Sequence, residues 1–420
     1  MKVIHISYSD TRGGAGRAAY RVHTSLKKNG VDSKMLVFHK YGDNSDVIQF
    51  RAGKVQNFLH KLRRNHEKFQ INNYKNRERG SFSIPSYGAN ISGLNIIKEA
   101  DILNLHWINK NFLSLKSIKQ LSQINKNIVW RFSDMWAFTG GCHCSGGCKK
   151  YEEKCGKCPF LGSRKVQDLS RGILSRKLKV LKDLSLTIVT PSNWLADCVK
   201  RSTLFKNNRI EVIPTPVDTE VFKPIEKGKA REILNLPDDK FFFLFAISPG
   251  ANMEGKGVDY LIESLLIINQ NFPNLRDKIE LLVLGAPYSE RIKRIPYNTR
   301  FLGTIYDDFA ISLYYNAADL FLSPSLQEAF GLTFIEAMSC ATPCIAFNYS
   351  GPVDIIDHKK NGFLAEYKSA EDIARGISWL LEDKKRLILL AKNAREKVLN
   401  NYTYDIIGKK YLNLYKSLLK

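Results

Sequence analysis

Two glutamates lie eight positions apart in the C-terminal half of the chain, in a pattern that reads as strand, loop and helix. Glu328 stands in the loop after an apolar run, and Glu336 stands in the helical stretch that follows. Carboxylates accept hydrogen bonds from sugar hydroxyl groups, and the N–H groups at a helix start bind phosphate oxygens. The pattern therefore predicts a site for a phosphorylated sugar compound. Its backbone contacts are expected from Phe330, Gly331, Leu332 and Thr333, because glycine lets a ligand approach closely.

A cation is expected beside these acids. Lys256 stands between Gly255 and Gly257, just ahead of a helical stretch, where an ammonium group can neutralise a departing diphosphate. Both features have a structural alternative. A lone lysine is usually a surface residue, and Thr333 with Glu336 has the spacing of a capping box, in which the glutamate reaches back to its own helix start.

Residues 324–337 read Pro-Ser-Leu-Gln-Glu-Ala-Phe-Gly-Leu-Thr-Phe-Ile-Glu-Ala. This string resembles glycosyltransferase family 4, with Ala329 in place of the usual glycine, and the similarity continues through residues 340–343, 350–352 and 361–364. The resemblance implies a retaining enzyme that takes a sugar from a UDP- or GDP-sugar donor. It assigns to Glu328 a catalytic contact with the donor sugar, and to Glu336 a contact with the nucleotide ribose.

The resemblance extends to Lys256, because family members carry a Lys-Gly pair there. They usually carry an arginine five residues earlier, a position that is Ala251 in this chain. Pyrophosphate binding then rests on Lys256 with backbone amides, or on an arginine from elsewhere. Such a site needs no Asp-x-Asp motif for a divalent metal, so no cofactor is expected in catalysis.

The loop between the first strand-like and the first helix-like stretch is rich in glycine. Its Gly13, Gly14 and Gly16 do not have the spacing of the dinucleotide fingerprint. In the resembling family this Gly-Gly loop faces the donor and the acceptor. We therefore assign Gly13 and Gly14 to the ligand cleft, with Arg17 as an anion contact.

A further candidate is the pair Ser133 and Asp134, which follows a strand-like run at 128–132. Many family 4 enzymes read His-Asp here, and that histidine commonly contacts the donor sugar. Either Ser133 takes the contact beside Asp134, or His106 or His143 does so. For His106 a structurally satisfied histidine is the alternative.

Five of the eight cysteines fall between positions 142 and 158. Cys155 and Cys158 have the spacing of a zinc knuckle, and Cys142 with Cys148 completes an all-thiolate tetrahedral site. This predicts a structural zinc ion, with free or redox-active thiols as the alternative. Family 4 enzymes of the colanic acid, capsule and O-antigen type look similar here, with Asp-Met-Trp-Ala-Phe-Thr-Gly before the cysteines.

Strand-like apolar runs alternate with amphipathic helical stretches along the chain, which predicts an α/β fold with parallel sheets. Two prolines at Pro214 and Pro216 indicate a domain boundary. We expect Rossmann-like domains at 1–215, with the cysteine-rich insertion 142–158, and at 216–400. A final helix at 401–420 could pack against either domain, and we assign it to the N-terminal one. The resemblance implies a GT-B architecture, with the two domains facing each other across a cleft, acceptor on the first and donor on the second.

The formal net charge of +23 is concentrated in one half of the chain. Residues 1–210 hold 38 Lys plus Arg against 14 Asp plus Glu, which leaves 26 against 27 in residues 211–420. This charge attracts anionic lipid, phosphorylated acceptors or nucleic acid. Residues 54–69 have the pattern of a basic amphipathic helix. We expect this helix either to lie on an anionic membrane or to pack on the N-terminal sheet. Its apolar face is made of Val55, Phe58, Leu59, Leu62 and Phe69.

Met1 leads directly into a strand-like run and no long apolar stretch follows, so we expect a soluble cytoplasmic protein at the inner face of the cytoplasmic membrane. The expected acceptor is a glycan or a lipid-linked saccharide in bacterial surface polysaccharide synthesis, of capsule or lipopolysaccharide, and nucleic acid is not expected as a partner. An NDP-sugar epimerase or phosphorylase on the same fold is the alternative enzyme. A basic scaffold for nucleic acid or membranes is the alternative of another class, but it leaves Glu328, Glu336 and Lys256 unexplained.

Overall fold

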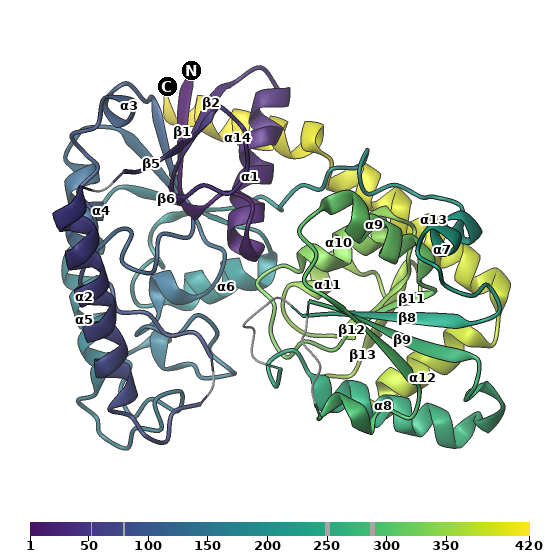
Figure 1. The fold of residues 1–420 in the computed structure, drawn as a ribbon. Coiled ribbons are helices and arrows are strands. Elements are labelled where there is room, and N and C mark those ends of the chain that lie inside the picture. Colours follow the sequence, from purple (N-terminus) through teal and green to yellow (C-terminus); the bar gives the residue numbers. More distant parts are fainter. Residues whose placement is uncertain (52, 79, 248–252, 286–289) are drawn as a thin grey trace. The chain divides into compact units, whose positions relative to one another are not determined.

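The computed structural model describes residues 1–51, 53–78, 80–247, 253–285 and 290–420. The chain forms two compact units. The first comprises Met1–Thr215 with Ile407–Lys420, and the second comprises Pro216–Ile406. Each unit is built on its own parallel sheet, and the two units are described separately below (Figure 1).

The first unit contains a seven-stranded sheet in the order β3-β2-β1-β4-β5-β6-β7. Its strands are β1 (Lys2–Ser9), β2 (Asp32–His39), β3 (Val47–Gln49), β4 (Ile102–Leu105), β5 (Asn127–Arg131), β6 (Leu186–Thr190) and β7 (Arg209–Val212). Its helices are α1 (Gly13–Lys28), α2 (Lys54–Asn72), α3 (Asn95–Lys98), α4 (Leu115–Ser122), α5 (Leu169–Leu181), α6 (Asn193–Arg201) and α14 (Tyr404–Leu418). The strand order reverses between β1 and β4, as in a doubly wound Rossmann-like sheet.

The second unit contains a six-stranded sheet in the order β10-β9-β8-β11-β12-β13. Its strands are β8 (Phe241–Ala246), β9 (Ile279–Leu284), β10 (Asn298–Gly303), β11 (Leu320–Ser323), β12 (Cys344–Phe347) and β13 (Gly362–Ala365). Its helices are α7 (Lys227–Ile233), α8 (Val258–Asn271), α9 (Asp308–Ala317), α10 (Leu332–Ser339), α11 (Pro352–Ile355), α12 (Ala370–Leu381) and α13 (Lys384–Asn401). The order reverses between β8 and β11.

Helices cover both faces of the second sheet, and this explains why its strands are apolar throughout. Along β8, Phe242 and Leu244 pack in the core cluster with α9, α10 and α13, whereas Phe243 and Phe245 pack in the cluster with α8 and α12. Figure 1 shows α9 and α10 on one side of this sheet and α8 and α12 on the other. A strand buried on both faces reads as a continuous apolar run, as Phe241–Ala246 does.

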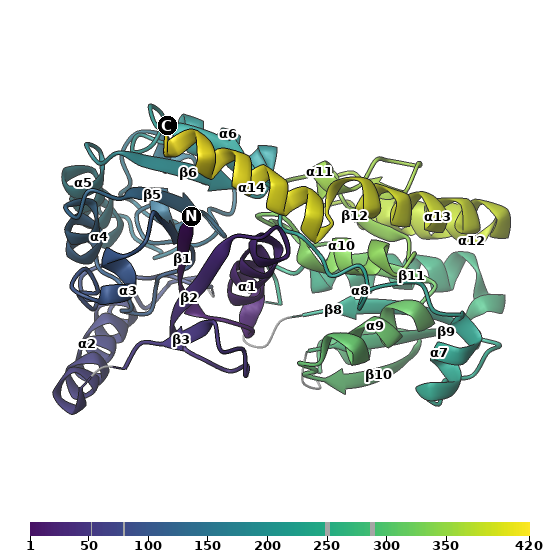
Figure 2. The same cartoon turned by 90° about the horizontal axis from the view of Figure 1, so that it is seen from above.

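Helix α14 belongs to the first unit for most of its length. Its Tyr411 and Leu414 pack in one cluster with Val3 of β1 and Ile102 of β4, and Figure 2 shows the helix lying along this unit. The second unit ends at Ile406 instead of the predicted 400. The reason is that the chain after α13 still bonds to this unit, through Val217 N–H and Tyr402 O at 2.9 Å. None of the described helices is long and apolar enough to cross a membrane.

Candidate active site

Two loops of the second unit meet where its strand order reverses. Lys256 lies in the loop after β8, and Glu328 lies in the loop after β11, the strand that pairs with β8. In open parallel sheets, ligands bind beyond the carboxyl ends of the strands at such a reversal, because the two loops leave the sheet in diverging directions. The topology therefore brings together two residues that are 72 positions apart in the chain.

The two side chains form an ion pair. Lys256 Nζ lies 2.5 Å from Glu328 Oε1, and the side chains are 25% and 21% exposed respectively. A pair that retains this much exposure is accessible to a ligand, in contrast to a fully buried pair. The ammonium group can turn to a diphosphate and the carboxylate can turn to sugar hydroxyl groups, so both roles predicted for them are compatible with their positions.

Close backbone packing holds the two loops together. Gly257 begins α8 with φ of +69°, and a Cβ at this residue would lie 1.8 Å from the carbonyl oxygen of Pro324. The N–H of Leu326 donates to the carbonyl of Gly255 at 2.9 Å. Glycine at position 257 is therefore required both by the left-handed conformation and by the neighbouring loop. The preceding part of the lysine motif, Gly250 to Asn252 with Ala251, lies outside the described residues.

The backbone of Glu328 is held by a third loop. Its N–H donates to Ser350 Oγ at 3.0 Å, and its carbonyl accepts from the Gly351 N–H at 2.9 Å. A Cβ on Gly351 would lie 2.5 Å from Cα of Phe330, so this contact also depends on glycine. These contacts fix the start of the Glu328 side chain and leave its carboxylate to interact with Lys256.

Helix α10 begins next to this ion pair. Its N-cap residue is Gly331, which has φ of +115° and offers no capping side chain, and Leu332 and Thr333 form the first turn. The capping-box alternative for Thr333 and Glu336 is therefore wrong, because the N-cap is Gly331, two residues before Thr333. Glu336 is buried and accepts a hydrogen bond from Tyr315 Oη at 3.2 Å. The N–H groups of this first turn carry the positive end of the helix dipole, which favours an anionic group.

The loop after β1 in the first unit contains three glycines, and the structural role of glycine differs at each position. Gly13 needs glycine for its φ of +73°, and a Cβ on Gly16 would lie 2.5 Å from Ser9 Oγ. A Cβ on Gly14 would meet no described heavy atom within 4 Å, so space remains above this residue. Arg17 is partly exposed on the same first turns of α1. Space for an approaching ligand is thus found at Gly14, beyond the end of β1.

Asp134 is the centre of a polar network beyond β5. Its carboxylate accepts from Trp107 Nε1 at 2.8 Å and from the Trp136 N–H at 2.8 Å, and it contacts His143 Nδ1 at 2.6 Å. Burial acts to raise the pKa of Asp134, but His143 and the two N–H donors outweigh it, so the pKa lies below its usual value. His143 also bonds to Ser83 Oγ through Nε2 at 3.0 Å.

The other polar residues predicted here have different surroundings. Ser133 is partly exposed and its Oγ accepts from Arg131 Nη1 at 3.1 Å. His106 is 1% exposed, and its Nε2 lies 2.8 Å from Nδ1 of His5 in the interior. Burial lowers the pKa of both His5 and His106 far below the usual value, so the rings are neutral. The structure favours the structural alternative for His106, and the pair Ser133 and Asp134 stays a prediction.

Residues 226–397 match the family model of glycosyl transferases group 1. Over 358 residues the chain is 25% identical to an uncharacterised glycosyltransferase of Methanocaldococcus jannaschii, which covers 80% of this chain and 87% of that one. The chain is a glycosyltransferase. The matched segment contains Lys256, Glu328 and Glu336, and it lies entirely in the second unit.

Other relatives of this glycosyltransferase match over a shorter length or by fold. It is 30% identical over 200 residues to D-inositol 3-phosphate glycosyltransferase 2 of Catenulispora acidiphila, spanning 45% of this chain and 46% of that enzyme. Its fold is similar to Anabaena HepE, solved with UDP and glucose, with a TM-score of 0.66 and 16% identity over 99% of this chain and all of that one. Sucrose-phosphate synthase of Thermosynechococcus elongatus has a TM-score of 0.65 at 18% identity, over 100% and 99% of the chains. The predicted GT-B fold with two Rossmann-like domains is thus confirmed, and the scaffold alternative is wrong.

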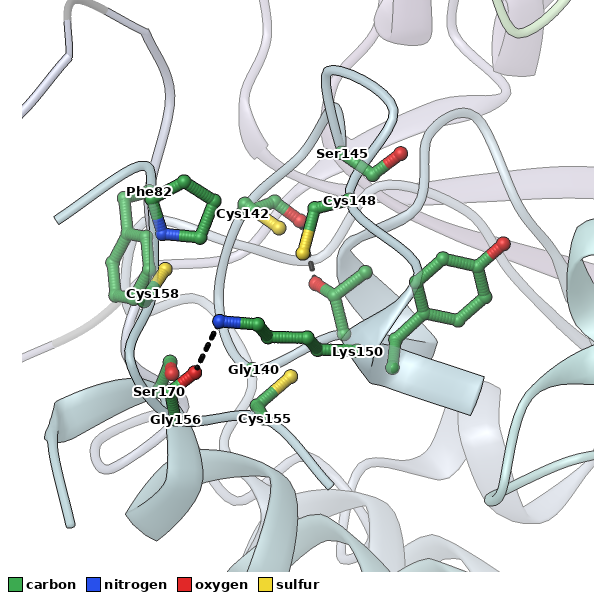
Figure 3. Close-up of a pocket in the computed structure, with 13 residues that line it drawn as sticks. Phe82, Gly140, Cys142, Ser145, Cys148, Lys150, Cys155, Gly156, Cys158 and Ser170 are labelled. Carbon is green, nitrogen blue, oxygen red and sulfur yellow. Dashed lines mark hydrogen bonds between the residues drawn. The ribbon is translucent and has the colours of Figure 1, made fainter. Parts of the chain in front are cut away.

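The four cysteines predicted to bind zinc line one pocket of about 330 Å³ in the first unit of the glycosyltransferase (Figure 3). Burial raises the pKa of Cys155 to about 12, and it also raises the pKa of Cys142 and Cys158, so these thiols are poor nucleophiles at neutral pH. Within the described ranges, no three Cys, His, Asp or Glu side chains are arranged so that they could hold a metal ion as they stand. Lys150 extends across the pocket and donates to the carbonyls of Gly156 and Lys157.

Sequence reasoning missed residues that position the site. Tyr315 holds Glu336, Ser350 holds the backbone of Glu328, and Trp107 holds Asp134. Ser350 had a signal, because it belongs to the segment 350–352 that resembles family 4. No pattern in the sequence indicated Tyr315 or Trp107, because their hydrogen-bond partners lie on other elements of the fold.

Proposed function

We propose that this glycosyltransferase moves a sugar from a nucleotide-activated donor to an acceptor hydroxyl, with retention of anomeric configuration. The contact between Lys256 and Glu328 beyond β8 and β11 carries the proposal. A nucleotide sugar offers a diphosphate and sugar hydroxyl groups side by side, which is the ligand that one ammonium and one carboxylate recognise together. The fold relative HepE, solved with UDP and glucose, supports this choice of donor.

Each site residue has one task in the proposed reaction. Lys256 offsets the charge that develops on the leaving diphosphate, together with the N–H groups from Phe330 to Thr333 at the start of α10. Glu328 accepts hydrogen bonds from the sugar hydroxyl groups. Glu336 binds the ribose hydroxyl groups with one oxygen while the other stays on Tyr315.

The bond changes follow a same-face displacement. The bond between the sugar C1 and the diphosphate oxygen breaks, and a bond between C1 and the acceptor oxygen forms on the same face of the sugar. The acceptor hydroxyl proton passes to the leaving phosphate oxygen, so no side chain has to take it. A cation near the diphosphate favours this path, since it stabilises the charge that builds before the new bond is complete.

The first unit is proposed to bind the acceptor. Gly13 and Gly14 let the acceptor approach the backbone beyond β1, and Arg17 pairs with a phosphate on it. Ser133 keeps the predicted contact with the donor sugar, and Asp134 beside it is kept ionised by His143 and its N–H donors. A lipid-linked saccharide of a bacterial surface polysaccharide fits these groups, because it combines hydroxyl groups with a diphosphate.

The donor assignment is tested by incubating the purified chain with a panel of UDP- and GDP-sugars and measuring release of nucleoside diphosphate. Glu328→Gln or Lys256→Ala is expected to lower the rate by about 10²- to 10³-fold, because each removes a charge that stabilises the transition state. Matched controls are Glu280→Gln and Lys227→Ala, since these residues form ion pairs of 2.7 and 2.5 Å elsewhere in the same unit.

Wild-type rates in both site variants, with the fold intact by circular dichroism, would reject the site. The same assay separates the alternative enzymes. An epimerase converts the donor without releasing nucleoside diphosphate, and a phosphorylase requires inorganic phosphate for turnover.

We propose further that α2 attaches the enzyme to an anionic membrane surface. Phe58, Leu62 and Phe69 lie on one face of this helix and are 62%, 50% and 63% exposed, so the alternative that this face packs on the sheet is not favoured for them. Lys61, Arg63, Arg64 and Lys68 flank them and match the sign of acidic lipid. The side chains of Val55 and Leu59 lie outside the described residues.

Flotation with vesicles of phosphatidylglycerol and phosphatidylcholine tests this attachment. Phe58→Ser with Phe69→Ser is expected to weaken vesicle binding by about tenfold or more, because each phenylalanine loses its burial in lipid. The control is Ile388→Ser with Leu389→Ser on α13, where two apolar residues are 62% and 56% exposed. Equal loss in both double variants would remove α2 as the attachment site.

A further inference from the structure

A long irregular segment connects β5 and α5 in the first unit. It runs from Phe132 to Asp168 and contains only two short 3-10 turns, at Trp136–Phe138 and Lys150–Glu152. A loop of this length orders only if something offsets its conformational entropy. Its first part is anchored in the interior by Phe132, Trp136 and Phe138, but the stretch after Phe138 buries only a few apolar side chains, which are Tyr151, Cys155, Cys158 and Leu161. A cross-link within the segment would meet this need.

The thiols of this segment converge on one pocket. Cys142, Cys148, Cys155 and Cys158 all line it, and their sulfur atoms lie around the Lys150 side chain in the view of Figure 3. The other cysteine of the segment, Cys144, is exposed and does not line the pocket. Four thiols from two pairs, the second with knuckle spacing, are the ligand set of a closed tetrahedral site.

Backbone N–H groups are already directed at the sulfur atoms. Those of Phe160 and Leu161 point at the Cys158 sulfur, and that of Gly140 points at the Cys155 sulfur. Asp168 accepts from the Cys158 N–H at 2.8 Å and also caps α5, so the knuckle is tied to a helix. Such donors offset charge on thiolates, and supporting contacts of this kind orient the ligands of a metal site.

A buried lysine lies beside the pocket. Lys177 of α5 is fully buried, and its ammonium group donates to the carbonyls of Trp136 and Thr139 while facing Cys142 and Cys155. A divalent ion with four thiolates carries two net negative charges. Lys177 offsets part of this charge, which explains an ammonium group that is otherwise costly to bury.

We propose that Cys142, Cys148, Cys155 and Cys158 bind one thiophilic divalent cation, Zn²⁺, as a structural site. His143 is excluded as a ligand because Asp134 and Ser83 occupy both ring nitrogens. Lys150 withdraws from the carbonyls of Gly156 and Lys157, and the thiols turn toward the ion and lose their protons to solvent. The site closes the segment 132–168 and takes no part in sugar transfer, so it does not depend on the proposed function.

Metal content of the whole chain tests the proposal. The chain is purified anaerobically, reconstituted with Zn²⁺ and desalted, and we expect about one zinc per chain in the wild type and in Cys144→Ser. Cys148→Ser and Cys158→Ser are expected to retain less than about one tenth of that amount, because a three-thiolate site binds far more weakly. Cys198→Ser, a buried thiol of α6 outside the pocket, is the second control. Zinc-free wild type, or an equal loss in Cys144→Ser, overturns the proposal.

Two measurements on the unsubstituted chain avoid variants that fail to fold. Titration with Co²⁺ should give thiolate charge-transfer absorption and tetrahedral d–d bands. Native alkylation followed by mass spectrometry should show the four pocket cysteines protected with Zn²⁺ and modified faster after chelation, with Cys144 modified at the same rate in both. Absence of thiolate absorption, or protection that chelation leaves unchanged, overturns the proposal.

Discussion

The two units have the same strand order around their first strand but differ in what lies beyond the strands. In the second unit, Lys256 and Glu328 bond to each other and remain partly exposed. In the first unit, His106 bonds to His5 and His143 bonds to Ser83 among interior side chains. Topology thus brings the candidate site residues together at the strand reversal, and burial decides which side chains remain accessible to a ligand.

Two aspartates, one in each unit, give the largest test of this comparison. Asp319 precedes β11 at the amino edge of the second sheet and pairs with Arg231 at 2.8 Å. Asp319→Asn is expected to cost about 3–5 kcal/mol, because it leaves the arginine buried without its partner. Turnover per folded molecule should be unchanged. Urea unfolding and donor turnover at low temperature measure the two effects.

Asp134→Asn is the counterpart in the first unit, at the carboxyl edge of the sheet. It is expected to lower kcat for transfer as well as stability, because it removes the charge that orders Trp107 and His143 at the ligand side. If Asp319→Asn lowered turnover more than Asp134→Asn did, the assignment of the carboxyl edge as the ligand side would be wrong.

The glycine at the start of α8 gives the next effect in size. Gly257→Ala is expected to destabilise the second unit by about 2–3 kcal/mol, since it combines a left-handed conformation with a clash against Pro324. Gly228→Ala in α7 is the control, because a Cβ there meets nothing within 4 Å, and it should stabilise the helix by about 0.5–1 kcal/mol. Denaturant midpoints compare the two, and a neutral Gly257→Ala would show that the loops do not need this contact.

The smallest expected effect is a difference between the two units in how their free energy of unfolding depends on pH. Burial lowers the pKa of His5 and His106 far below the usual value and that of His23 to about 4. Below about pH 6.5 the unfolded chain then binds more protons than the folded unit, so the stability of the first unit falls as the pH drops from 7 toward 5, by up to about 1.4 kcal/mol per pH unit and group.

The second unit contains one of the eight histidines, His358, which is exposed. Its unfolding transition should therefore shift less over this range in calorimetry. His23→Gln should reduce the shift of the first unit, since it removes one of the titrating groups. Equal shifts of both transitions would contradict the contrast between the interiors.

The sequence by itself determined the fold class and indicated the main acids of the candidate site. Parallel strands buried on both faces must be continuous apolar runs, so β8 and β9 could be predicted from their apolar residues alone. Glu328 and Glu336 could be singled out as candidate site residues because the loop and the helix that carry them follow each other directly in the chain. Local periodicity and short spacings are properties of the chain before it folds.

Only the tertiary structure determined which side chains hydrogen-bond to the candidate site residues. Tyr315 lies 21 positions from Glu336, Ser350 lies 22 from Glu328, and Trp107 lies 27 from Asp134. His106 looked like a ligand at a strand end, but His5 on the neighbouring strand holds it inside. A hydrogen bond between distant residues depends on how the elements pack, and no short-range pattern of residue types records that packing.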